Sequence, residues 1–123
     1  IDRETLEPRF KVIGSDLWSN EKGFAEEIAA TGVTGVCGSG IIEALGEMFL
    51  SGILLSDGTI DGSMAAISPR IQATDRTFSY VLFEGEITLA VTQNDVRAIQ
   101  LAKAALFAGA ALLMDKMDVD HVD

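Results

Sequence analysis

A glycine-rich segment at residues 33–40 carries the strongest chemical signal in the sequence. It places three glycines, a cysteine and a serine directly before an apolar pattern of helical period, namely Gly35, Cys37, Gly38, Ser39 and Gly40. Glycines let another group approach the main chain closely, and the N-terminus of a following helix favours an anion. Gly38, Ser39 and Gly40 therefore either hold an anionic ligand group or form a packing loop in which Ser39 caps the helix.

The spacing of these glycines limits which ligand site they could form. Gly35, Gly38 and Gly40 do not have the dinucleotide-binding spacing, and no Gly-Lys-Ser/Thr follows as a P-loop requires. The segment alone therefore leaves both interpretations open.

Lys103 is the second chemical candidate. It falls on the apolar stripe of a helix predicted over residues 93–116, between Ile99 and Leu106, with Gln100 on an adjoining strip. Burying an unpaired ammonium group is expensive. Lys103 must therefore reach a carboxylate, extend to solvent, or face a ligand.

Residues 56–62 imitate the start of a calcium-binding loop. Asp57, Thr59 and Asp61 have the required spacing, but Ser68 stands where the bidentate Glu of an EF-hand loop is needed. Asp-Gly pairs are ordinary turn formers, so we expect a turn here.

Cys37 is the single cysteine of the sequence. It excludes an internal disulfide and fits a reducing, cytoplasmic compartment. With one cysteine and one histidine, the chain cannot build a zinc or iron–sulfur site by itself. We expect the Cys37 side chain to pack in the interior; the alternative is a reactive or redox-sensing thiol at the start of the following helix. We expect Glu43 and Glu47, one helical turn apart, to be solvated on the outer face.

The length and net charge of the chain exclude some classes of function. The 123 residues suffice for one domain with a core that needs neither disulfides nor a structural metal. A net charge of −10 argues against a nucleic-acid partner. The sequence is 48% apolar, yet no apolar run looks long enough to cross a bilayer, which predicts a soluble protein without a membrane partner. The chain reads as an excised piece of a larger protein.

Periodicity and turn residues predict the elements that position these candidates. The last helix is apolar on nearly all sides, so it should be central and buried, with Thr92 as its N-cap and Asp95 completing a capping box. Gly85 is expected to supply a positive φ in a hairpin turn. The predicted elements are a strand over 9–14, helices over 19–30, 39–50 and 93–116, and hairpin strands over 77–83 and 86–90.

Two segments together resemble a known family. GVCGSGIIE at residues 35–43 and LAVTQNDVRAIQLAKAA at residues 89–105 are similar to the C-terminal domain of the reductive activators of corrinoid proteins. These are iron–sulfur proteins whose C-terminal part shares the fold of acetate and sugar kinases, Hsp-type chaperones, hexokinase and actin. The resemblance covers most of the chain from Arg9 onward, with residues 15–30 as an insertion.

The resemblance implies an α/β fold, an incomplete actin/hexokinase-like subdomain that forms one domain over residues 1–123. It implies ATP-dependent, one-electron reduction of a cob(II)amide to the cob(I)amide state, with a corrinoid protein of a methyltransfer system as partner. ATP with Mg²⁺ would bind the whole protein, and the iron–sulfur cluster would lie outside this chain.

The same resemblance assigns site residues. In the wider superfamily a helix of this interval touches the adenine and ribose, a placement that Gln100 and Lys103 match. Gly38, Ser39 and Gly40 complete the predicted nucleotide-binding set. Phosphate motifs are expected before Ile1 and the adenosine motif after Asp123, so this chain alone is expected to be inactive toward ATP.

The alternative function is a self-associating regulatory or scaffold module in which the glycine segment only packs. Under either hypothesis the last helix leaves apolar surface on both sides when the chain is taken alone. Such surface tends to recruit a partner, which predicts a homodimer or larger homo-oligomer.

Overall fold

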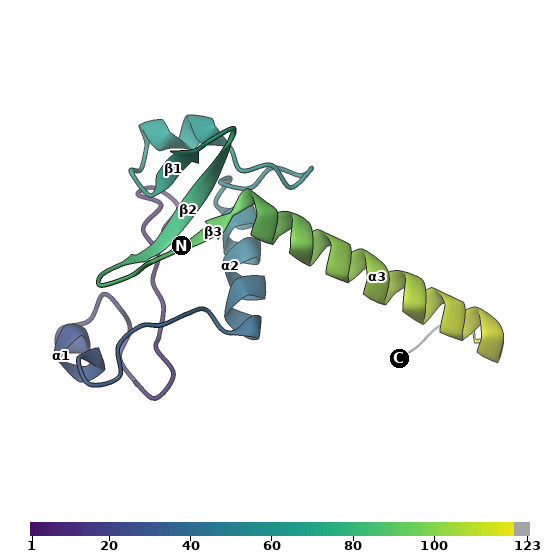
Figure 1. The fold of residues 1–123 in the computed structure, drawn as a ribbon, viewed down its shortest axis with the longest axis horizontal. Coiled ribbons are helices and arrows are strands. Elements are labelled where there is room, and N and C mark those ends of the chain that lie inside the picture. Colours follow the sequence, from purple (N-terminus) through teal and green to yellow (C-terminus); the bar gives the residue numbers. More distant parts are fainter. Residues whose placement is uncertain (120–123) are drawn as a thin grey trace.

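The computed structural model describes residues 1–119 and confirms the α/β class (Figure 1). The elements in chain order are α1 (Phe24–Ile28), α2 (Gly38–Leu50), the 3-10 helix η1 (Gly62–Ala66), β1 (Ile71–Thr74), β2 (Thr77–Glu84), β3 (Thr88–Thr92) and α3 (Gln93–Met117).

The three strands form one antiparallel sheet in the order β1-β2-β3. Tyr80 lies opposite Ile71 on one side and Val91 on the other, which confirms the predicted hairpin and adds β1. Gly85 does not have the expected positive φ. Its lack of a side chain serves a different purpose, because a Cβ there would lie 2.6 Å from the Phe83 ring.

The core lies between α2, the sheet and the first turn of α3. It includes Leu6, Leu45, Met48, Ile53, Leu54, Ile60, Ile71, Tyr80, Val91 and Val96. The Tyr80 hydroxyl is buried and donates a 2.7 Å hydrogen bond to the backbone oxygen of Leu6. This bond ties the N-terminal segment to the middle of the sheet and gives the buried Tyr80 hydroxyl an acceptor.

Helix α2 begins and ends close to the predicted bounds, but its N-cap differs. Cys37 has an extended conformation, and its Sγ accepts a hydrogen bond from the Gly40 N–H at 3.3 Å. Ser39 lies inside the first turn, so it does not cap the helix as the packing-loop alternative required. The thiol takes the place of the usual hydroxyl or carboxylate cap.

The N-terminal third is less regular than predicted. The strand expected over residues 9–14 is wrong, because only an isolated bridge between Lys11 and Trp18 forms there. The helix expected over residues 19–30 shortens to α1, five residues long. Gly23 precedes α1 with φ +93°, a left-handed conformation that a continuous right-handed helix cannot contain.

Helix α3 is 25 residues long and begins with the predicted capping box between Thr92 and Asp95. It projects away from the rest of the molecule (Figure 1). Its buried residues are Gln93 and Val96, both in the first turn. The expectation of a helix buried on all sides is therefore wrong for this chain, and Lys103 is exposed.

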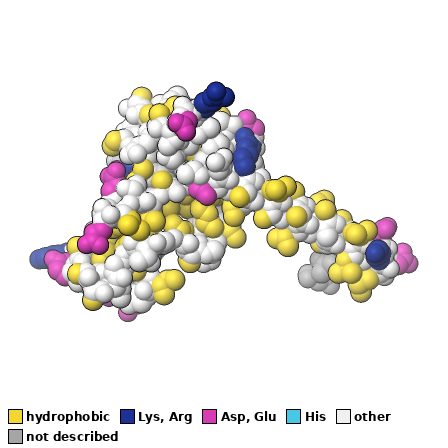
Figure 2. Space-filling model, in the orientation of Figure 1, with side chains coloured by type: hydrophobic (Ala, Val, Ile, Leu, Met, Phe, Trp, Pro, Cys, Tyr) yellow, Lys and Arg dark blue, Asp and Glu magenta, His cyan; other side chains and the backbone are white. Residues whose placement is uncertain are grey.

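Large apolar side chains of α3 remain in contact with solvent (Figure 2). They include Leu101, Leu106, Phe107, Leu112, Leu113 and Met117. By length and composition α3 is apolar enough to cross a membrane, so the expectation that no such run exists is wrong. Core helices of large soluble domains have the same length and composition.

Candidate functional site

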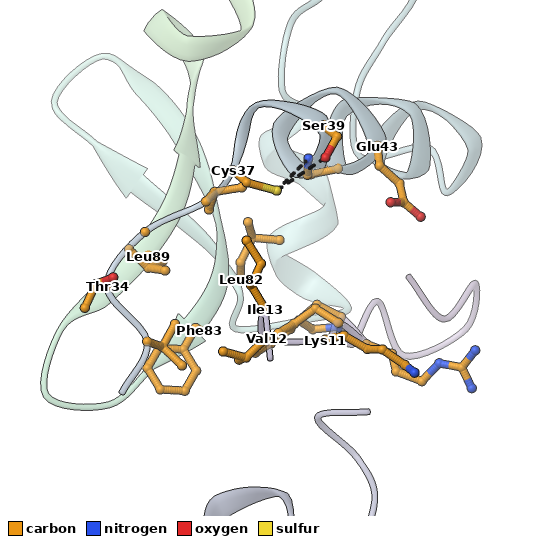
Figure 3. Close-up of a pocket in the computed structure, with 18 of the residues that line it drawn as sticks. Lys11, Val12, Ile13, Thr34, Cys37, Ser39, Glu43, Leu82, Phe83 and Leu89 are labelled. Atoms are coloured by element: carbon orange, nitrogen blue, oxygen red, sulfur yellow. Dashed lines mark hydrogen bonds between the residues drawn. The ribbon is translucent and has the colours of Figure 1, made fainter. Parts of the chain in front are cut away.

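A cavity of about 610 Å³ opens where the glycine-rich segment meets the sheet (Figure 3). Its walls come from residues 8–13, residues 31–37 and the first turns of α2. Leu82, Phe83 and Leu89 line it from the hairpin, and Val12 and Ile13 from the N-terminal segment. Its volume lies in the range of small-molecule sites.

Cys37, Ser39 and Gly40 form the polar edge of this cavity. The Cys37 sulfur lies 3.4 Å from the Ser39 hydroxyl oxygen and points at the first turn of α2 (Figure 3). Hydrogen bonds from Ser39 and then from the Gly40 N–H stabilise the thiolate, which lowers the pKa of Cys37. Cys37 is exposed, so the prediction that it packs in the interior is wrong.

Charged side chains line the outer part of the cavity. The Arg9 guanidinium lies 4.3 Å from the centre of the Trp18 ring and the Lys11 ammonium 5.2 Å from it, both cation–π contacts. Glu43 is exposed, as predicted, whereas Glu47 is half-buried and pairs with Arg3 at 3.4 Å. Residues 1–119 contain no group of three metal-ligating side chains.

The second part of the predicted site lies at the start of α3. The Gln100 Oε1 accepts a 2.8 Å hydrogen bond from Arg97 Nη1, which also donates to the Asp57 backbone oxygen at 2.8 Å. The Asp57 carboxylate accepts from the Thr59 N–H at 2.8 Å, so residues 56–59 form the predicted turn. Hydrogen bonding from Thr59 lowers the pKa of Asp57.

The structure separates the two halves of the predicted nucleotide-binding set. Gly38, Ser39 and Gly40 form the N-terminal end of α2, whereas Gln100 contacts the turn that follows its C-terminal end. Thirteen residues of helix span about 20 Å. Lys103 is exposed and makes no ion pair within residues 1–119. These five residues do not share one cavity here, and their roles stay a prediction.

Sequence reasoning missed Gln93. It is buried at the start of α3 and makes two hydrogen bonds to the loop after α2. Its position directly after the N-cap Thr92 was visible, but a first-turn glutamine is ordinarily exposed. No sequence signal pointed to the loop that it meets.

Comparison with known families places this geometry in a class. The family described as the C-terminal domain of RACo, the ASKHA domain, matches residues 1–123. The chain therefore belongs to this family. The match confirms the resemblance drawn from residues 35–43 and 89–105, and it extends over the N-terminal third as well.

The chain is also similar to one characterised protein. The chain is 31% identical over 106 residues to the corrinoid activation enzyme RamQ of Eubacterium limosum. The aligned part covers 78% of this chain and 18% of RamQ, so the chain spans less than a fifth of its relative's length. No solved structure matches the chain.

Proposed function

We propose that this chain is part of an ATP-using, iron–sulfur protein of the cytoplasm that supports reductive reactivation of a corrinoid. The reaction adds one electron to a cob(II)amide and gives the cob(I)amide state of a methyltransfer system. The match of the whole chain to the RACo C-terminal family carries the proposal. The name of the relative RamQ, a corrinoid activation enzyme, suggests the substrate class.

The electron must come from outside this chain. Cys37 is its single cysteine, and residues 1–119 hold no group of metal-ligating side chains. The donor set therefore does not fit an iron–sulfur cluster, which needs four thiolates or their equivalents. We assign the cluster to another region of the same protein and the corrinoid protein to the role of electron acceptor.

Two separate parts of the chain have groups that suit ATP, although they do not share one cavity here. The N-terminal end of α2 suits an anionic phosphate, and the exposed ammonium of Lys103 suits a phosphate or the ribose, so a joint site would need the rest of the protein. Bound ATP with Mg²⁺ would supply the free energy of its hydrolysis to the reduction. The phosphate and Mg²⁺ ligands that hydrolysis requires are not assembled within residues 1–119, so we expect this chain alone to be inactive toward ATP.

The experiment that tests the proposal follows the corrinoid by visible absorption. The full-length protein is mixed with its reductant and a corrinoid protein in the cob(II)amide state, with ATP or with no nucleotide. Cob(I)amide forms only when ATP is present if the proposal is right. Formation at the same rate without ATP contradicts it.

The exposed apolar surface of α3 favours a second candidate function. Exposed leucines lie on more than one face of this helix: Leu101 and Leu112 share one face, and Leu106 and Leu113 lie about a third of a turn away. A self-associating scaffold module would use such a surface without catalysis. This candidate predicts no ATP-dependent formation of cob(I)amide by the full-length protein, so the absorption experiment separates the two.

A further inference from the structure

Helix α3 carries a polar stripe that binds the turn at residues 56–59. Gln93, Arg97 and Gln100 are spaced so that they share one face of the helix. Gln93 Nε2 donates to the Gly58 backbone oxygen at 2.6 Å, and Gln93 Oε1 accepts from the Ile60 N–H at 2.9 Å. Both main-chain groups are thereby paired in a buried position.

Arg97 extends this contact one turn further along α3. Its Nη1 donates to the Asp57 backbone oxygen and to Gln100 Oε1, each at 2.8 Å. Gln100 Nε2 lies 3.4 Å from the same Asp57 oxygen. The Gln100 amide is therefore held by Arg97 and the turn.

Gly58 is required for this close approach. Its φ is +82°, and a Cβ at this position would lie 2.1 Å from Gln100 Nε2. Any other residue would be strained in the backbone and would displace the Gln100 side chain. The side chains of α3 thus bind the turn, and Gly58 in the turn leaves room for one of them, Gln100.

The contact with the turn lies at the end of α3 that packs against the rest of the molecule. The buried residues of α3 are Gln93 and Val96, in its first turn. Lys103 lies ten residues beyond Gln93, about 15 Å along the axis. A small change in the angle of α3 at Gln93 therefore displaces Lys103, and a displacement of about 1 Å is enough to weaken contact with a ligand.

We infer that Gln93, Arg97 and Gly58 are positioning residues for the nucleotide contact predicted on α3. They fix the turn at residues 56–59 to the helix and so set where Lys103 lies. Arg97 acts through the Asp57 carbonyl oxygen and through Gln100. The inference rests on the proposed function, because it takes ATP to be the ligand that meets this helix.

The test measures ATP affinity of the full-length protein by calorimetric titration. The variants are Arg97→Ala, Arg97→Lys and Gly58→Ala, with Asn94→Ala, an exposed change in the same helix, as control. If Arg97→Ala displaces Lys103, the charged contact of Lys103 with ATP is lost, which predicts about tenfold weaker binding for this variant. Arg97→Lys keeps one donor and should recover part of the affinity. Thermal unfolding of each variant reports any loss of fold.

Gly58→Ala separates positioning from direct contact. It adds no group that could reach ATP, so weaker binding in this variant supports the inference. Unchanged affinity in Gly58→Ala and Arg97→Ala overturns it, and so does a lowered melting temperature without a change in the Kd. If the unmodified protein binds no ATP, the proposed function fails, and the inference fails with it.

Discussion

At the scale of single residues, Cys37 shows how local geometry changes an expectation. Cysteine is among the most buried residue types, which favoured a packing role. The structure instead uses its sulfur as the cap of α2 at the edge of a cavity. The sequence could not reveal this, because the path of residues 31–37 over the sheet leaves the side chain in contact with solvent.

Thiol alkylation tests the environment of Cys37. Hydrogen bonds from Ser39 and Gly40 stabilise the thiolate, so the pKa lies below that of a free cysteine. The alkylation rate should therefore reach half its maximum at a lower pH than for free cysteine. Ser39→Ala removes the hydrogen bond that lowers the pKa of Cys37 most, so it should move this midpoint to higher pH. The exposed change Ser56→Ala should leave the midpoint where it is. Identical profiles for all three proteins contradict the assignment.

Replacing the buried Gln93 should lower the free energy of unfolding substantially. Gln93→Leu leaves the Ile60 N–H and the Gly58 carbonyl buried without their partners. Each such group costs about 1–3 kcal/mol, so the free energy of unfolding should fall by at least 2 kcal/mol or so. Urea denaturation measures this, with Asn94→Ala as the exposed neighbour. A loss no larger than that of the control shows that water satisfies both groups.

At the scale of elements, the sequence predicted those with strong local signals. Helix α2, the hairpin and α3 follow from apolar periodicity and from the residues that end them. Residues 9–14 alternate like a strand but find no partner strand, and Gly23 interrupts the helix predicted around it. Periodicity indicates which face of a segment is apolar, but it does not show whether a neighbouring strand is present to pair with it.

The capping box of α3 gives a prediction at this scale. The Thr92 hydroxyl accepts from the Asp95 N–H at 3.2 Å, and the Asp95 carboxylate accepts from the Thr92 N–H at 2.8 Å. Thr92→Ala should lower the free energy of unfolding by about 1 kcal/mol. Asp95→Ala should cost a similar amount, and the double variant less than the sum. Strict additivity in urea denaturation would mean that the two bonds form independently.

At the scale of the whole molecule, two findings fit a chain that is part of a longer protein. The two halves of the predicted site are separate, and α3 is largely exposed. The chain spans less than a fifth of RamQ, and exposed apolar side chains lie on more than one face of α3. The apolar pattern was predictable from the sequence, but its exposure was not, because periodicity does not show whether another element covers a helix, and within residues 1–119 the buried residues of α3 are Gln93 and Val96. A helix of this kind is stable in water when other elements cover it.

Self-association of the isolated chain follows from this surface. Light scattering should give a dimer mass or a larger one for residues 1–123. Leu106→Glu together with Leu113→Glu should shift the mass toward the monomer, whereas Ala98→Glu near the start of α3 should not. A monomer mass for the unmodified chain at high concentration contradicts the expectation.

The measurement that tests the central claim most directly is the rate of cob(I)amide formation at limiting and at saturating ATP. It is made on the full-length protein, on Lys103→Ala and on Lys116→Ala, which removes another ammonium from α3. The account predicts that Lys103→Ala raises the ATP concentration needed for half-maximal rate by about tenfold, while Lys116→Ala leaves it unchanged. Equal ATP dependence in all three proteins would contradict the claim that this helix contacts the nucleotide.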